Sequence, residues 1–174
     1  KILVENFINH PFYSVNNILV GKYLEIIKNK ECVGFLRKGD LRGKFLLKSF
    51  GVKKFYFYNF GSIFLRIIYL IKALKIISKM HSIKDFNNLK IDKLDIGLLT
   101  YDTFLRYSRI ATTNKFNLRL INFFAEALYA NDYISKIISK DNITELVQSE
   151  KQFIPLNIFF QKFLTFKTNK VYAR

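Results

Sequence analysis

The stretch that decides the fold is Val52-Lys-Lys-Phe-Tyr-Phe-Tyr58, followed directly by the segment 60–79. The first part is rich in aromatic residues and begins with a β-branched one, which predicts a strand. The second part has apolar residues at helical spacing, which predicts an amphipathic helix. A strand that leads straight into a helix is the repeating unit of α/β folds, so this pair predicts that class.

The predicted helix 60–79 has one apolar stripe, roughly 120° wide at about 100° per residue. Its members are Ile63, Ile67, Leu70, Ile71, Leu74 and Ile77. Lys72, Lys75 and Lys79 fall together beside the stripe. A stripe of this width usually faces a core, and we expect it to do so here. The same pattern also fits a helix that lies on anionic lipid.

The alternation of strand and helix continues on both sides of this pair. Further strands are predicted over residues 2–7, 31–36, 94–100, 143–147 and 170–173, and further helices over 15–30, 45–50, 117–139 and 155–166. The strands are continuous apolar runs, as expected of strands that are covered on both faces. We therefore expect an α/β fold with a mainly parallel, Rossmann-like sheet flanked by helices, in a single domain over residues 1–174.

Composition excludes several classes of protein. The chain has 174 residues, of which 50% are hydrophobic, and this excludes intrinsic disorder. Cys32 is the one cysteine, which excludes a disulfide-stapled scaffold. Only two histidines accompany it, so a structural zinc site with four Cys or His ligands is also excluded, and no metal is expected.

The chain is strongly basic, with 29 Lys and Arg against 13 Asp and Glu, and 29 − 13 gives a net charge of +16. Lys, Ile, Phe, Asn and Tyr are all abundant and all have AT-rich codons, so part of the charge reflects genome composition. The remaining field favours anionic partners such as phosphates, acidic glycans or anionic lipid. A nucleic-acid partner is not expected, because the aromatic residues are not interleaved with basic ones.

No apolar stretch is long enough to span a membrane, and the N-terminal segment lacks the pattern of a signal peptide. We therefore expect a cytoplasmic protein. The first residue is not Met, and the last residues, Lys170-Val-Tyr-Ala-Arg174, look like a strand about to continue. These two features predict that the chain is a fragment of a longer protein.

The common nucleotide and hydrolase motifs are absent. Gly39-Asp-Leu-Arg-Gly43 contains two glycines, but it is neither a Walker loop nor a GxGxxG turn. The sequence also contains no GxSxG elbow and no HExxH motif. A standard phosphate-binding loop is therefore not predicted.

The most distinctive motif is Asp95-Ile-Gly-Leu-Leu-Thr-Tyr-Asp-Thr-Phe-Leu-Arg106. If residues 94–100 form a strand, Tyr101, Asp102 and Arg106 follow its carboxyl end, where ligands bind in open α/β sheets. Asp102 could accept a proton from a sugar hydroxyl, and Arg106 could hold a phosphate or carboxylate. The same residues also fit a helix cap followed by an ordinary i, i+4 ion pair.

A second motif is Phe153-Ile-Pro-Leu-Asn-Ile-Phe-Phe-Gln161. Asn157 and Gln161 share one helix face at i, i+4, and amides on an apolar helix can point into a cleft. The motif also fits an ordinary helix start with Pro155 in the first turn. Arg174 ends the following strand, where ligands also gather.

His10 follows the first predicted strand. A histidine at this position could act as a base or hold a ligand hydroxyl. It equally fits a loop residue without a chemical role.

Two segments of the chain resemble bacterial surface-polysaccharide (capsule and O-antigen) biosynthesis proteins. Residues 96–106 resemble that family's Gly-Asp-Leu-Ile-Tyr-Asp-(Ser/Thr)-Tyr-Leu-Arg segment, although Leu98 stands where the family often has Asp. Residues 154–161 and 170–174 are similar to a later segment of the family. The looser likeness extends from about His10 to the end of the chain.

The resemblance implies a glycosyltransferase-like protein with two Rossmann-type domains, of which this chain is the acceptor-side half. It implies a glycan or lipid-linked sugar as acceptor, reached at the inner face of the membrane. The nucleotide-sugar donor is expected in the other half, with no cofactor bound tightly here and no turnover by this half alone. By residue match, Tyr101, Asp102 and Arg106 would line the cleft between the two domains. The match does not identify the general base, for which Asp102 and His10 are the candidates. The alternative is a basic peripheral membrane- or anion-binding module without catalysis.

Overall fold

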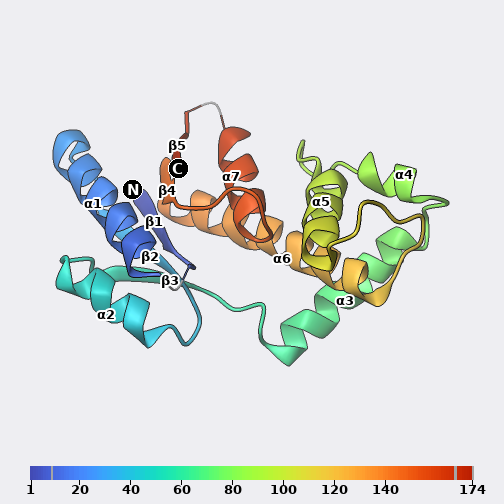
Figure 1. Ribbon diagram of the computed structural model, residues 1–174. Coiled ribbons are helices and arrows are strands. Elements are labelled where there is room, and N and C mark those ends of the chain that lie inside the picture. Colours follow the sequence, from blue (N-terminus) through green and yellow to red (C-terminus); the bar gives the residue numbers. More distant parts are fainter. Residues whose placement is uncertain (9, 167, 174) are drawn as a thin grey trace. The chain divides into compact units, whose positions relative to one another are not determined.

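The computed structural model describes residues 1–8, 10–166 and 168–173. It is an α/β fold with a five-stranded sheet whose strands are all parallel, in the order β3-β2-β1-β4-β5 (Figure 1). The strands are β1 (Ile2–Asn6), β2 (Cys32–Arg37), β3 (Lys54–Tyr58), β4 (Glu145–Gln148) and β5 (Lys170–Ala173). The predicted α/β class and the parallel, Rossmann-like sheet are confirmed.

The helices of the described residues alternate with these strands as the sequence predicts, apart from two within the segment that joins β3 to α6. They are α1 (Pro11–Lys28), α2 (Leu41–Ser49), α3 (Ile63–Ile77), α4 (Ile83–Asn87), α5 (Ile96–Ser108), α6 (Leu118–Asp141) and α7 (Leu156–Leu164). None of them combines the length and the apolarity that a membrane span requires.

The chain divides into two compact units. The first comprises Lys1–Asn59, Ser135–Lys151 and Phe166–Arg174, and it contains the whole sheet with α1 and α2. The second comprises Phe60–Ile134 and Gln152–Thr165, and it is helical. The expectation that residues 1–174 form a single domain stays a prediction.

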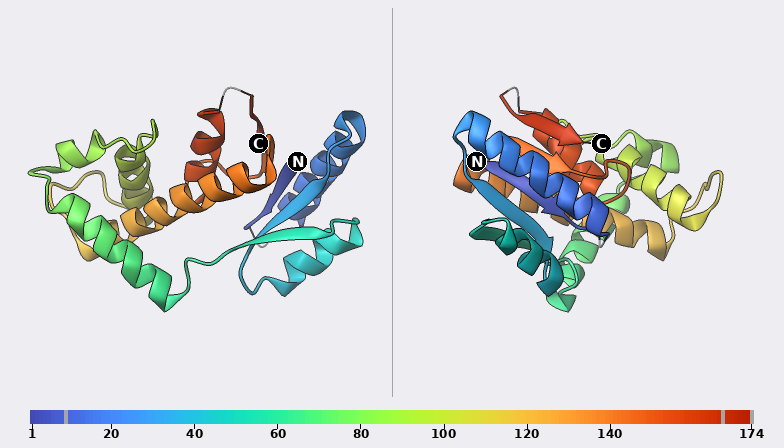
Figure 2. Two further views of the ribbon diagram at one scale, coloured as in Figure 1. Left: turned by 180° about the vertical axis from the view of Figure 1, so that it is seen from behind. Right: turned by 60° about the vertical axis from the view of Figure 1, so that its left-hand side comes forward.

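The core of the first unit lies between α1 and the sheet. Helix α1 packs across β1 and also contacts β2 and β4 (Figure 2, right). Val4 and Ile18 are fully buried in this contact. Gly21 allows the close approach, because a Cβ there would lie only 2.5 Å from a methyl group of Val4. The side chain of any larger residue at position 21 would push α1 away from β1.

The start of α1 differs from the prediction. The sequence predicts a helix over 15–30, but α1 begins at Pro11 with His10 as its N-cap. Proline is well suited to the first helical position because its φ is already helical and its missing N–H is not needed there. Ser14 therefore lies inside the helix, where its hydroxyl donates to the carbonyl of His10 at 3.2 Å.

Residues 94–100 do not form the predicted strand. They enter helix α5, which buries Ile96, Thr100 and Phe104 at helical spacing. Gly97 lies so close to the preceding helix α4 that a Cβ would come within 1.7 Å of the Phe86 carbonyl oxygen. A short apolar run fits a strand or a helix equally well, and here tertiary contact selects the helix.

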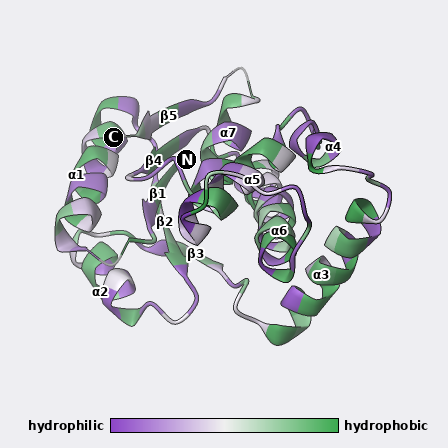
Figure 3. Ribbon diagram, turned by 45° about the vertical axis from the view of Figure 1, so that its right-hand side comes forward, coloured by the Kyte–Doolittle hydropathy of each residue, from purple (hydrophilic) through white to green (hydrophobic). Residues whose placement is uncertain are grey.

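Helix α3 is confirmed, but most of its predicted core stripe is exposed. Ile77 is buried, whereas Ile63, Ile67, Ile71 and Leu74 are largely in solvent. Hydropathy colouring shows α3 as predominantly hydrophobic along its length (Figure 3). Periodicity gave the width of the stripe correctly but not the side of the helix that packs.

Candidate functional site

The strand order creates a topological switch point between β1 and β4. From β1 the chain moves to β2 and β3 on one side, and β4 lies on the other side of β1. In open parallel sheets, ligands bind outside the carboxyl ends of the strands at such a point. Asn6 and Gln148 end the two strands that meet there.

Buried polar side chains gather at this carboxyl edge of the sheet. We call them the switch-point cluster: Glu5, Asn6, Ser14, Asn17, Gln148 and Ser149. All of them are at least nine-tenths buried. Burying this much polar surface is costly unless the groups bond to one another or to a ligand.

Glu5 is the centre of the cluster. One carboxylate oxygen accepts a hydrogen bond from the backbone N–H of Phe7. The other accepts from the N–H of Ser149 at 3.1 Å, from its hydroxyl at 3.0 Å, and from the amide of Asn17 at 3.3 Å. Burial raises the pKa of Glu5 above its usual value, and the hydrogen bonds from Ser149 and Phe7 only partly oppose this.

These contacts give Glu5 a positioning role. Both of its carboxylate oxygens already accept hydrogen bonds from groups of the protein. Glu5 therefore connects the end of β1, the first turns of α1 and the segment after β4. Asn17 adds a second link by donating to the Glu5 backbone carbonyl at 2.9 Å. The side chains around the switch point are thereby held in fixed positions.

A groove of about 690 Å³ opens beside the cluster, between α1 and the end of the sheet at β4 and β5. We call it the α1–β4 groove. Amide and hydroxyl groups of Asn16, Asn17, Gln148 and Ser149 line it. The aromatic rings of Phe12, Tyr13 and Tyr172 also line it. Amides and hydroxyls both donate and accept hydrogen bonds, and rings can cover apolar faces, so the lining suits a polyhydroxylated ligand.

A second hollow, of about 640 Å³, lies beside the first turn of α2. Asn6, Ser14 and Arg42 contribute its polar groups. The side-chain oxygen of Asn6 is buried and has no hydrogen-bond partner among the described residues. It is therefore an acceptor that a ligand hydroxyl could satisfy.

The opposite, amino edge of the sheet carries ion pairs instead. Glu145, nearly fully buried, accepts hydrogen bonds from Lys28 at 2.6 Å and from Lys30 at 2.8 Å. Burial alone would raise the pKa of Glu145, but the hydrogen bonds from the two lysines and Tyr172 lower it overall. These contacts join α1, its following loop and β4, so we expect the ion pairs at this edge to stabilise the fold of the first unit.

The sequence-predicted trio Tyr101, Asp102 and Arg106 lies on helix α5 and does not follow a strand. That part of the prediction is wrong because α5 begins at Ile96, within the expected strand. The Tyr101 side chain is buried, and its hydroxyl bonds to the Thr112 hydroxyl and the Thr113 backbone, each at 3.0 Å. Asp102 and Arg106 form an i, i+4 ion pair at 3.0 Å with both side chains about half exposed.

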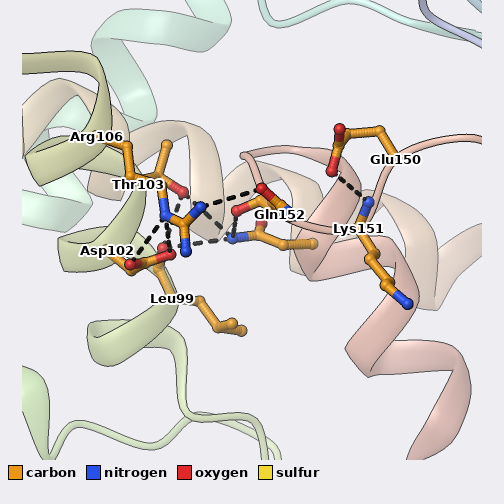
Figure 4. Close-up of polar contacts among 8 residues, drawn as sticks. Leu99, Asp102, Thr103, Arg106, Glu150, Lys151 and Gln152 are labelled. Carbon is orange, nitrogen blue, oxygen red and sulfur yellow. Dashed lines mark hydrogen bonds and ion pairs between the residues drawn. The ribbon is translucent and has the colours of Figure 1, made fainter.

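Residues of the two sequence motifs do meet within the second unit. Figure 4 shows the Arg106 guanidinium between Asp102 and Gln152. It donates a hydrogen bond to the side-chain oxygen of Gln152 at 3.0 Å. Asn157, at the start of α7, donates to the Thr103 hydroxyl at 3.2 Å and to the Leu99 carbonyl at 3.3 Å. Asn157 is fully buried, and these two hydrogen bonds connect α7 to α5.

The other predicted site residues have different surroundings. Gln161 is half-buried one turn beyond Asn157. Arg174 lies outside the described residues. His10 belongs to the first unit, where it is exposed at the start of α1, with its ring centroid 5.5 Å from that of Tyr13 in the groove. Asp102, Arg106 and Asn157 belong to the second unit.

Sequence reasoning did not single out Glu5, Asn6 or Ser149. A signal for them was present, because each lies at or just after the carboxyl end of a correctly predicted strand. Polar residues in those positions point to the ligand edge of a parallel sheet. The candidate site was instead predicted at the 95–106 motif, because the apolar start of that motif resembles a strand.

The described residues contain no group of three or more His, Cys, Asp or Glu side chains placed to hold a metal ion. Comparisons with family models, with curated proteins and with solved structures gave no match to this chain.

Proposed function

We propose that this chain is the acceptor-side domain of a glycosyltransferase for surface polysaccharide assembly, and that the α1–β4 groove holds the sugar acceptor. One observation carries the proposal: amides, a hydroxyl and aromatic rings line a single groove at the carboxyl edge of a parallel sheet. The resemblance of residues 96–106 and 154–161 to polysaccharide biosynthesis proteins supports a glycan as the ligand.

The groove offers the contacts that a sugar requires. Asn16 is half-buried on α1 and presents an amide that can both donate to and accept from neighbouring hydroxyls. Tyr13 and Tyr172 supply ring faces against which the C–H face of a sugar can lie. The hydrogen bonds that Asn17 and Ser149 donate to Glu5 hold both side chains in place, so these groups need little reordering when a ligand binds.

The proposed reaction is transfer from a nucleotide-sugar to an acceptor hydroxyl. The acceptor oxygen bonds to the anomeric carbon while the bond from that carbon to the phosphate oxygen breaks. The nucleotide phosphate leaves with the electron pair, and a base takes the acceptor proton. His10 is the candidate base nearest in sequence to the groove, and Asp102 is the second candidate. The leaving phosphates need a cationic partner, and the sequence offers Arg106 and Arg174 as candidates for that role.

Saccharide binding tests the proposal. Saturation-transfer NMR with a panel of capsule-type oligosaccharides should reveal binding to the 174-residue chain. Asn16→Ala, which removes an amide, and Tyr13→Ala, which removes a ring face, should each weaken it by about twofold to tenfold. Tyr23→Ala is the matched control, because Tyr23 is exposed on the same helix outside the groove. Absence of saccharide binding, or equal loss in all three variants, would contradict the proposal.

The assignment of the base needs glycosyl transfer by the full-length protein. If His10 is the base, His10→Ala should reduce transfer strongly while leaving saccharide affinity unchanged, and Asp102→Asn should leave both unchanged. The reverse result would assign the role to Asp102. Unchanged transfer in both variants would remove both residues from the mechanism.

A further inference from the structure

Helix α3 carries a broad apolar surface that is left exposed among the residues the structure describes. We call it the α3 apolar face: Ile63, Phe64, Ile67, Ile68, Ile71 and Leu74, all exposed. Ile63 and Phe64 are 78% and 73% exposed. Single exposed apolar residues are ordinary, but a contiguous group of six marks an interaction surface.

This face lies opposite the side of α3 that packs. Successive residues turn by about 100°, which puts the six apolar residues within roughly 140° of one another. On the other side, Ala73 and Ile77 are buried, and the Tyr69 hydroxyl donates to Asp132 of α6 at 3.0 Å. The apolar face is therefore additional to the surface that fixes α3 in the second unit.

The charged residues that α3 and its flanking positions contribute are all positive. Residues 60–80 contain four Lys or Arg and no Asp or Glu. Lys72, Lys75 and Lys79 border one edge of the face. Lys72 is paired with Asp132 at 2.8 Å, whereas Lys75 and Lys79 have no ion pair among the described residues. A surface hollow of about 320 Å³ is lined by Ile68, Ile71, Lys72 and Lys75, which brings apolar and cationic groups together.

We propose that the α3 apolar face docks on an anionic lipid bilayer. In this arrangement α3 lies in the plane of the membrane surface, its apolar side chains enter the acyl boundary, and its lysines meet the lipid phosphates. The hollow beside Lys72 and Lys75 fits a lipid phosphate above the acyl region. A helix of 15 residues needs no membrane-spanning length to bind in this way.

Charge favours a membrane over a second copy of the chain as the occupant. A symmetric dimer through this face would bring two identical lysine edges together in molecules that each carry +16. On an anionic bilayer the lysines do not face one another, and each of them is attracted to the lipid phosphates. The proposal depends on α3 alone, so a failure of saccharide binding in the α1–β4 groove would leave it unaffected.

Vesicle co-sedimentation provides the first test. The chain should bind vesicles of phosphatidylcholine mixed with phosphatidylglycerol, and bind pure phosphatidylcholine vesicles much more weakly. Ile63→Ser with Phe64→Ser should reduce binding to the mixed vesicles by about tenfold or more. Leu41→Ser with Phe45→Ser is the matched control, because these two α2 residues are each 76% exposed, and it should bind like the wild type.

Charge variants test the electrostatic part. Lys75→Gln with Lys79→Gln should reduce affinity for the mixed vesicles by about thirtyfold, the value of two charges near an anionic surface. Raising the salt concentration from about 0.1 M to about 0.5 M should weaken wild-type binding in the same direction. Equal binding to neutral and anionic vesicles would overturn the proposal.

A fluorescent reporter gives a direct test of insertion. The chain contains no Trp, so Phe64→Trp introduces a single reporter in the apolar face. Its emission should shift to the blue on addition of mixed vesicles, whereas Phe45→Trp on α2 should not respond. An unresponsive Phe64→Trp overturns the proposal. So does a wild-type dimer in sedimentation that Ile63→Ser with Phe64→Ser converts to a monomer, since the face would then join two copies.

Discussion

The Glu5 carboxylate accepts hydrogen bonds from both the backbone N–H and the hydroxyl of Ser149, a residue 144 positions away in the chain. The two contacts join the end of the first strand to the segment that leaves the fourth. They fix the switch point of the sheet, which is where the proposed sugar groove opens. The connection makes Glu5 and Ser149 natural targets for mutation.

Ser149→Ala should lower the free energy of unfolding by about 1–3 kcal/mol. The substitution removes one hydrogen bond to a buried carboxylate and leaves that oxygen less satisfied. Urea unfolding followed by circular dichroism measures the change. Ser139→Ala, at an exposed position, should change stability by no more than about 0.5 kcal/mol. Equal midpoints for Ser149→Ala and the wild type would show that the contact contributes nothing.

Glu5 should make the protein less stable as the pH rises above 4.5, the usual pKa of a glutamate. Because the pKa of Glu5 is raised in the folded state, the folded protein retains a proton that the unfolded chain loses. This contribution to stability is complete below 4.5 and disappears as the pH passes the folded pKa. The unfolding free energy of the wild type should therefore fall relative to Glu5→Gln across this range. A constant difference at every pH would contradict the raised pKa.

Gly97→Ala should destabilise the second unit by about 1–3 kcal/mol or more. A methyl group at position 97 would overlap the Phe86 carbonyl oxygen, so α5 would have to move away from α4. Gly61→Ala is the control, because a Cβ there meets nothing within 4 Å. Thermal unfolding of both variants gives the comparison. Similar melting temperatures would mean that α5 does not approach α4 so closely.

Cys32 should resist alkylation in the folded protein. Burial raises the pKa of its thiol to about 12, so almost no reactive thiolate exists near pH 8. The thiol also donates to the Gly21 carbonyl at 3.1 Å. Mass spectrometry after iodoacetamide treatment should show little labelling until denaturant is added, and full labelling afterwards. Rapid labelling of the native protein would indicate that α1 separates readily from β2.

Local sequence patterns predicted the type of secondary structure correctly wherever a segment fits one pattern and has a length typical of one kind of element. The runs at β2 and β3 are apolar or aromatic and end in charged or turn residues, and both form strands. The long periodic segment of α6, predicted over 117–139, was predicted almost to its ends. The parallel arrangement followed from the alternation of such elements.

A short apolar run did not by itself distinguish a strand from a helix. Residues 94–100 read as a strand, yet the approach of Gly97 to Phe86 makes them part of a helix. In the same way, the candidate pair Asp102 and Arg106 was identified correctly as an i, i+4 pair, while its position after a strand was not. Contacts between separate helices decided both points, and no local pattern contains them.

The sequence by itself determined the α/β class, the positions of the five strands alongside a sixth that does not form, and the helical character of segment 60–79, because periodicity and β-propensity are local properties of the chain. Only the tertiary structure decided that Glu5 meets Ser149, that amides line one groove, and that the apolar face of α3 points outward. Each of these depends on segments far apart in the sequence coming together, or failing to cover one another. Local preferences cannot specify that outcome.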